Sequence, residues 1–105
     1  MVFNKPIFIE KLDEKTGDYK LEWKLHACVN KTGGKNYSDS GAERTGLSLT
    51  FEVRYFKAIS DIFANFQNYR IIYNRMIFYI TDYDDYMENH HTVRLTGDFS
   101  GRQGN

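Results

Sequence analysis

Hydrophobic and polar residues alternate along two stretches of the chain, residues 19–30 and 47–55, with Cys28 as the exception in the first. A period of two is typical of a β-strand with one face on a core and the other in solvent. We therefore expect two long strands. Their predicted inward residues are Tyr19, Leu21, Trp23, Leu25, Ala27 and Val29 in the first, and Leu47, Leu49, Phe51, Val53 and Tyr55 in the second.

Four shorter apolar segments, residues 6–12, 69–73, 77–83 and 92–96, have the length of strands. Pro6 favours a sheet edge or a strand entrance, because proline lacks the N–H that a ladder needs. Asn74 and Arg75 lie between two of these segments and predict a tight hairpin, although a type I′ turn favours glycine where Arg75 stands.

One segment follows a different period. In residues 57–67 the apolar residues are Ile59, Ile62, Phe63 and Phe66, a spacing that predicts a short helix. Ser60 or Asp61 is the expected cap at its start. The predicted fold is therefore mostly β: a small antiparallel β-barrel or sandwich of about six strands with one short helix.

Between the two long strands lies a glycine-rich segment, residues 31–46, which contains four glycines. A loop of this length in a small domain is usually functional or flexible, and we expect a long flexible loop. Residues 101–105 are expected to be a frayed tail. With 105 residues, the chain has the size of one domain, 1–105.

Charge is balanced overall, with 14 basic and 14 acidic residues, which argues against a nucleic-acid binder that works through bulk positive charge. Residues 24–57 are locally basic, whereas residues 82–91 hold four acids and no Lys or Arg. Cys28 is the single cysteine, so no intramolecular disulfide forms and a reducing compartment is expected. No signal peptide or membrane-spanning run is predicted.

Two motifs suggest ligands but lack the required spacing. Gly33-Gly34-Lys35 is followed by Asn36, whereas a P-loop needs Ser or Thr after its lysine. The acidic run of Asp82, Asp84, Asp85 and Glu88 has Met87 and Val93 where a calcium loop needs glycine and a carboxylate. We interpret this run as a solvated acidic turn, with a docking surface for a basic partner as the alternative.

The histidines and the cysteine predict no reaction centre. His90 and His91 are neighbours and point apart in an extended chain, and His26 is expected on the solvent side of its strand. Cys28 is expected to be a half-buried structural thiol. We therefore predict no catalytic residue, no cofactor and no metal, and a protein that is not an enzyme.

The order of several short motifs resembles bacteriophage head–tail joining proteins, also called head-closure or stopper proteins. Residues 68–98, NYRIIYNRMIFYITDYDDYMENHHTVRLTGD, look like the end of that family, where an "N-G-x-x-Y/F-x-I" strand precedes an acidic turn and a final "H-x-T-V-R-L-x-G". Residues 16–37 and 49–62 resemble its upstream segments, so the resemblance spans about residues 7–98. Arg75 and Lys35 depart from the family pattern, which often has glycine and an acidic residue there.

The resemblance implies a structural virion protein of a phage or prophage, made in the bacterial host cytoplasm. Such proteins form a homo-oligomeric ring below the portal and its adaptor, retain packaged DNA and offer a surface for the tail. It implies contacts with adaptor, portal and tail proteins, a passing contact with DNA and none with a membrane. We expect the isolated chain to be a monomer. The loop implied to face the channel comprises Lys31, Thr32, Gly33, Gly34, Lys35, Asn36, Tyr37, Ser38, Asp39, Ser40 and Gly41.

Two other classes of function compete with this interpretation. An OB- or SH3-like binding module would place aromatic residues on an exposed sheet face, whereas the aromatics of the two long strands are predicted to point inward. A small enzyme would need an acid–base pair or an activated nucleophile, and the sequence shows neither.

Overall fold

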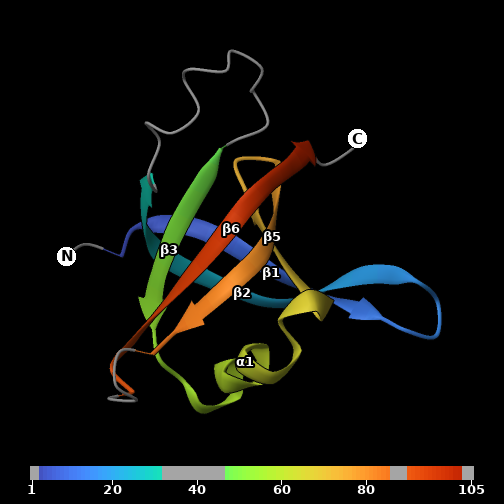
Figure 1. Ribbon diagram of the computed structural model, residues 1–105, viewed down its shortest axis with the longest axis horizontal. Helices are drawn as coiled ribbons and strands as arrows, with labels where there is room; N and C mark the ends of the chain where they lie inside the picture. The colour runs from blue at the N-terminus through green and yellow to red at the C-terminus, as the bar shows by residue number, and fades with distance from the viewer. Residues whose placement is uncertain (1–2, 32–46, 86–89, 103–105) are drawn as a thin grey trace.

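Six antiparallel strands close into a barrel in the computed structural model, which describes residues 3–31, 47–85 and 90–102 (Figure 1). Neighbours around the barrel follow the order β1-β2-β3-β6-β5-β4, and β1 pairs with β4 to complete the circle. The predicted mostly β, antiparallel architecture is confirmed, with a barrel rather than a sandwich. The strands are β1 (Lys5–Asp13), β2 (Asp18–Lys31), β3 (Ser48–Arg54), β4 (Tyr69–Tyr73), β5 (Met76–Asp84) and β6 (Thr92–Arg102).

The hairpin of β1 and β2 projects beyond the barrel wall as a two-stranded ribbon (Figure 1). Its turn uses Gly17 at φ 80°, a left-handed conformation that glycine adopts without strain. The β1–β2 register shifts after Ile9, which pairs with Trp23, because the next residue of β1 pairs with Leu21. This bulge at Glu22 reverses the alternation in β2. The prediction for Leu21 is therefore wrong, since its side chain is 60% exposed.

The core fills the barrel with side chains from all six strands. Phe51 lies at its centre, with its ring 5.4 Å from that of Phe78 and 5.8 Å from that of Tyr73. Gly97 gives Phe78 its space, because a Cβ at residue 97 would lie 2.9 Å from the Cβ of Phe78. The buried core residues are Ile7, Ile9, Ala27, Phe51, Val53, Ile59, Ile62, Tyr69, Ile71, Phe78, Ile80, Val93 and Leu95.

The alternation predicted for the second long strand is confirmed in β3, where Phe51 and Val53 are buried and Leu49 is half-buried. Glu52 was expected to point outward into solvent. It is nearly covered, and its Oε2 lies 3.4 Å from Nη2 of Arg94 on β6. An ion pair across neighbouring strands explains how a carboxylate is kept on this half-buried surface.

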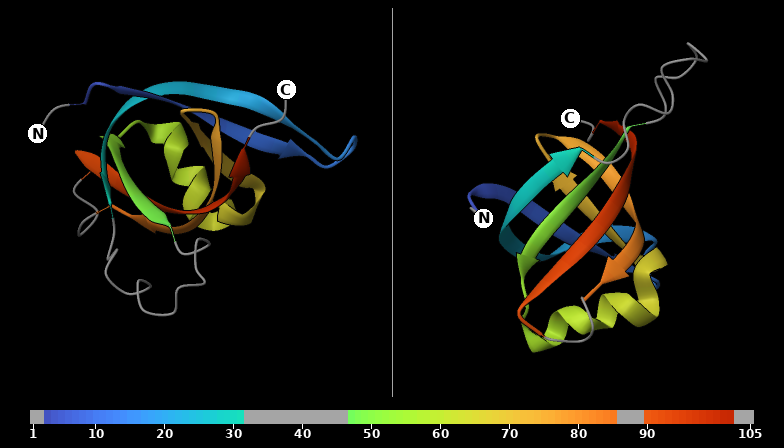
Figure 2. Two further views of the ribbon diagram at one scale, coloured as in Figure 1. Left: turned by 90° about the horizontal axis from the view of Figure 1, so that it is seen from above. Right: turned by 60° about the vertical axis from the view of Figure 1, so that its left-hand side comes forward.

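A helical segment covers one open end of the barrel (Figure 2). It consists of η3 (Lys57–Ser60), α1 (Asp61–Asn65) and η4 (Phe66–Asn68). Ile59 and Ile62 enter the core as predicted, but Phe63 and Phe66 are 69% and 41% exposed. The prediction of one apolar face is wrong for these two residues, because 3₁₀ turns on both sides of a five-residue helix change the angular spacing.

The predicted side-chain cap of the helix is absent. Ser60 is the residue before α1, but its hydroxyl donates a hydrogen bond to the carbonyl oxygen of Lys57, at 2.8 Å. Asp61 is the first residue of α1, and its carboxylate accepts hydrogen bonds from Asn65 and Tyr69. The local geometry thus uses both side chains to hold the helical segment together.

The hairpin between β4 and β5 is confirmed. Asn74 and Arg75 have φ values of 52° and 64°, the left-handed pair that a type I′ turn requires, and Tyr73 pairs with Met76. At the other end of the chain, β6 runs through Gly101 to Arg102, which lies beyond the start of the predicted tail.

Candidate functional site

The two ends of the long β2–β3 segment are held together at one rim of the barrel. Lys31, the last residue of β2, pairs with Leu49 of β3. The hydroxyl of Ser48 donates a hydrogen bond to Oδ1 of Asp98, at 2.6 Å, and the N–H of Phe99 donates to the carbonyl oxygen of Leu47, at 2.9 Å. These bonds anchor the chain where the segment rejoins the barrel. Of the residues implied to face a channel, Lys31 is described and exposed, whereas Thr32 to Gly41 lie outside the described residues.

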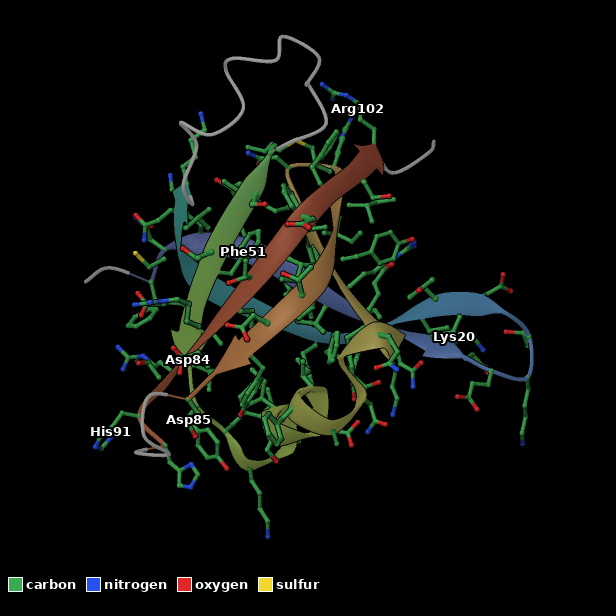
Figure 3. The ribbon with its side chains drawn as sticks, viewed as in Figure 1. Lys20, Phe51, Asp84, Asp85, His91 and Arg102 are labelled. Atoms are coloured by element: carbon green, nitrogen blue, oxygen red, sulfur yellow. The ribbon has the colours of Figure 1, made fainter. Side chains whose placement is uncertain are left out.

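The acidic turn lies at the opposite end of the barrel, where β5 ends beside α1 (Figure 3). A register shift between Ile80 and Asp82 leaves Asp82 paired with Thr96, and Asp84 pairs with Arg94. Asp82 and Asp84 are both exposed, so their carboxylates are available on the surface. Glu88, the fourth acid of the predicted docking surface, lies outside the described residues.

Asp85 differs from the two exposed acids, because its side chain is only 8% exposed. Its Oδ1 accepts a hydrogen bond from the backbone N–H of His90, at 3.0 Å, and its Oδ2 lies 2.7 Å from Nδ1 of the same residue. The His90 ring packs on Tyr55, with 4.5 Å between ring centroids. Asp85 therefore holds the chain that enters β6, and of the four acids predicted to form a docking surface, Asp82 and Asp84 are the described ones with exposed side chains.

Aromatic side chains of the helical segment lie near the end of β5, the strand that carries Asp82 and Asp84. Phe63 of α1 is exposed on one side and packs its ring 5.7 Å from that of Tyr83. Burial, together with the nearby charge of Asp85, raises the pKa of Tyr83 to about 12. Phe66 adds a second partly exposed ring. We call Phe63, Phe66, Asp82 and Asp84 the acidic–aromatic end of the barrel.

The sequence reasoning missed the aromatic half of this surface. Phe63 and Phe66 fit the apolar spacing of a buried helix face, so the pattern itself assigned them to the core. The sequence did contain a signal for the exposure of Phe63 and Phe66. The same segment contains Ile59 and Ile62, and these two side chains are the ones that enter the core.

The outer wall carries a second group of charged and aromatic residues, on β1, β4, β5 and the projecting hairpin. The guanidinium of Arg70 donates a hydrogen bond from Nε to Oε1 of Glu10, at 2.8 Å, and lies 3.9 Å from the ring centroid of Tyr19. The ring of Tyr79 lies 6.3 Å from that of Tyr19. Tyr19 was predicted to point inward, and the bulge in β2 places it on this outer surface instead.

Among the described residues, no group of three or more His, Cys, Asp or Glu side chains is arranged to hold a metal ion. His26 lies on β2, far along the chain from His90, whose ring contacts Asp85. Cys28 is half-buried, and its Sγ lies 3.7 Å from the side-chain nitrogen of Asn30. In the same part of the chain, no helix is both long and apolar enough to cross a membrane.

The fold by itself does not define a function, and exposed aromatic side chains such as Phe63 are a feature of surfaces that bind other proteins. A family model of phage head completion proteins matches residues 8–97, which run from β1 into β6. The chain belongs to the phage head completion protein family. No curated protein matches the chain significantly.

Membership of this family gives the chain a structural role in the phage head, and therefore a place in the virion. It confirms the resemblance to phage head-closure proteins that the motifs indicated. It also implies contacts with other phage head or tail proteins, for which the acidic–aromatic end is a candidate surface.

Proposed function

We propose that this domain assembles into a ring in the head–tail connector, below the portal and its adaptor. In this proposal the ring closes the DNA channel and provides the surface on which the tail attaches. The observation that carries it is the pairing of Lys31 with Leu49, which fixes both ends of the intervening segment at one rim of the barrel. In a ring, every subunit contributes one such rim, so a small domain can close a channel through symmetry.

The composition of the segment suits a channel. The segment has three positive residues, Lys31, Lys35 and Arg44, against two acidic ones, and it contains four glycines, so it can approach a DNA backbone closely in several conformations. The proposed channel-facing residues are Lys31 to Gly41. Their contact with DNA would be a passing one, because the chain as a whole carries no net charge.

The opposite end of the barrel is the proposed docking surface. Strand β3 runs from Ser48, beside the segment, to Arg54, beside the acidic turn, so the two functions lie at opposite ends of one rigid wall (Figure 1). Asp82 and Asp84 would attract a basic partner, and Phe63 would supply apolar contact. The partner in this proposal is an adaptor or tail protein of the same phage.

Deleting residues 36–43 in the phage tests the channel role. We expect a folded protein, since halving a surface loop changes stability by only about 0.6 kcal/mol. Particles should package DNA but leak it or fail to join tails, as measured by nuclease-accessible DNA and by tail counts in micrographs. A variant in which a Gly/Ser sequence of equal length replaces residues 36–43 is the matched control, because it keeps the length of the segment and removes its side chains.

The outcomes separate the alternatives. Normal infectious particles from the deletion would exclude the channel role, and loss of folding would show that the segment is structural. We also expect the purified chain to sediment as a monomer and to assemble only on its partner. A stable ring of the isolated chain would contradict that expectation.

A further inference from the structure

Pairing between β2 and β3 covers only a short stretch of each strand. It runs from Lys31↔Leu49 to Cys28↔Glu52. Beyond this point β2 continues toward the projecting hairpin, whereas β3 continues to the end of the barrel beside α1 (Figure 1). The two strands therefore diverge, and the barrel wall opens between them.

The opening is a groove of about 680 Å³, between residues 24–26 of β2 and residues 53–56 of β3 and the chain that follows, and Phe3 before β1 also lines it. We call it the β2–β3 groove. Leu25 and Val53 point toward the core and Phe56 packs its ring edge-on against Trp23, 5.1 Å away, so the groove has an apolar floor. Its volume is within the range of about 300–1,000 Å³ that is usual for ligand sites.

The rim of the groove is basic. Lys24, His26 and Arg54 line it, and no acidic residue among those that the structure describes does. In the described part of the chain neither Lys24 nor Arg54 forms an ion pair, whereas Arg70 and Arg94 each bind a glutamate. The Arg54 guanidinium instead lies 4.7 Å over the ring of Phe3, and the Lys24 ammonium lies 5.9 Å from the ring centroid of Phe8. These two charges remain available to an acidic partner.

The backbone along the groove is available as well. Residues 24–27 of β2 have their registered partners on β1, and among the described strands no partner is registered on their other edge. On the opposite side, the N–H of Tyr55 donates to the carbonyl oxygen of His91, at 3.0 Å, and so points toward β6. Because successive amides alternate, the N–H of Arg54 points toward the groove. Open strand edges are templates for an added strand.

We infer that the β2–β3 groove binds an extended, acidic polypeptide segment of a partner protein, which pairs as a strand along residues 24–27 of β2. The main chain of this segment would form the hydrogen bonds of the strand pairing, and its carboxylates would reach Lys24 and Arg54 across the groove. The inference is independent of the proposed ring, since it concerns the isolated domain.

The test is a titration of the purified chain with a ten-residue peptide of alternating threonine and glutamate. The readouts are amide chemical shifts and amide hydrogen exchange by NMR. We expect all four residues 24–27 to show shifted amide signals, and the amides that point away from β1, every second one of them, to exchange more slowly. Lys24→Glu combined with Arg54→Glu should weaken binding about tenfold or more. Lys15→Glu combined with Arg102→Glu changes the charge equally outside the groove and should leave binding unchanged.

Two further probes separate strand pairing from charge attraction. The same peptide N-methylated at every residue keeps its carboxylates but has no backbone N–H to donate to β2, and it should bind at least tenfold more weakly. Equal binding of the methylated peptide, or tighter binding of a ten-residue oligothymidylate, would overturn the inference. So would protection, in the free protein, of those amides of residues 24–27 that point away from β1, which would mean that the chain itself fills the groove.

Discussion

The hydroxyl of Tyr69 donates a hydrogen bond to Oδ2 of Asp61, at 2.5 Å. This bond joins the first residue of α1 to the first residue of β4, so it fixes the helical segment across the end of the barrel. Lys11 lies 3.7 Å from the same carboxylate oxygen, and the ring of Trp23 stacks on that of Tyr69 at 5.7 Å. The hydrogen bond from Tyr69 holds the pKa of Asp61 below its usual value, and burial with that same bond raises the pKa of Tyr69.

Tyr69→Phe removes this hydrogen bond and keeps the ring on Trp23. We expect the free energy of unfolding at neutral pH to fall by about 1 kcal/mol, at the lower end for a bond to a charged group because the Asp61 side chain is 45% exposed. Chemical denaturation measures the difference. Tyr73→Phe is the matched control, because its ring packs on Phe51 without a described hydrogen bond from its hydroxyl.

The same variant has an expected pH dependence. Because the folded-state pKa of Asp61 is lowered, its contribution is complete above the unfolded-state value of about 3.9 and is lost as the pH falls through the folded-state value. The stabilities of wild type and Tyr69→Phe should therefore converge at acid pH. A difference that stays constant from neutral to strongly acid solution would contradict the role of the charged carboxylate.

Core substitutions test the register of β2. Phe51→Ala removes a fully buried ring and should cost about 3–5 kcal/mol, enough to unfold a marginal domain. Trp23→Ala should cost a similar amount, because that ring packs on Tyr69 and Phe56. Leu21→Ala lies two residues away on the other side of the bulge and should cost less than about 0.5 kcal/mol. Similar melting temperatures for the Trp23 and Leu21 variants would show that the bulge is not where we describe it.

Arg75→Gly should stabilise the protein. Arg75 has a φ of 64°, a conformation that costs a residue with a Cβ about 1 kcal/mol and costs glycine little. We expect the free energy of unfolding to rise by about 0.5–1 kcal/mol, with Asn-Gly then forming the preferred type I′ turn. Asn74→Gly should gain less, because asparagine tolerates this conformation. A loss of stability in Arg75→Gly would mean that its side chain makes a contact that matters more than backbone strain.

Charge reversal tests the acidic–aromatic end. Asp82→Lys combined with Asp84→Lys should leave the barrel folded, because both side chains are exposed, and should weaken capture by the connector partner about tenfold or more. Glu14→Lys combined with Asp18→Lys makes the same charge change on the projecting hairpin and serves as the control. Co-sedimentation with connector proteins measures the binding. Equal binding of both double variants would rule out this end as the docking surface.

Much of the barrel could be predicted from the period of the sequence. The alternation through Phe51 and Val53 identified a strand with one face on the core, and Asn74 with Arg75 identified the hairpin. These features depend on residues close together in the chain, which is why a local pattern detects them.

The rest depends on register and on contacts between distant residues. The bulge at Glu22 has no glycine to mark it, so the alternation through Leu21 continued past the point where the side chains change face. The contact between Asp85 and His90 forms with His90 at a φ of 58°, a backbone conformation that the sequence around His90 does not predict. The β2–β3 groove lies where the pairing of β2 with β3 stops. Counting charges along the sequence showed only that residues 24–57 are locally basic.

The position of β6 has a consequence for how the protein is made. Although β6 is the last strand in the chain, it lies between β3 and β5 in the barrel, and Ser48 pairs with Asp98 fifty residues later. Until the ribosome has released residues 92–102, the first five strands can form only an open sheet whose two edges are β3 and β5. Such edges pair readily with other chains, and closure through distant contacts is slow. Translation that stops before Thr92 therefore leaves an aggregation-prone sheet rather than a smaller barrel.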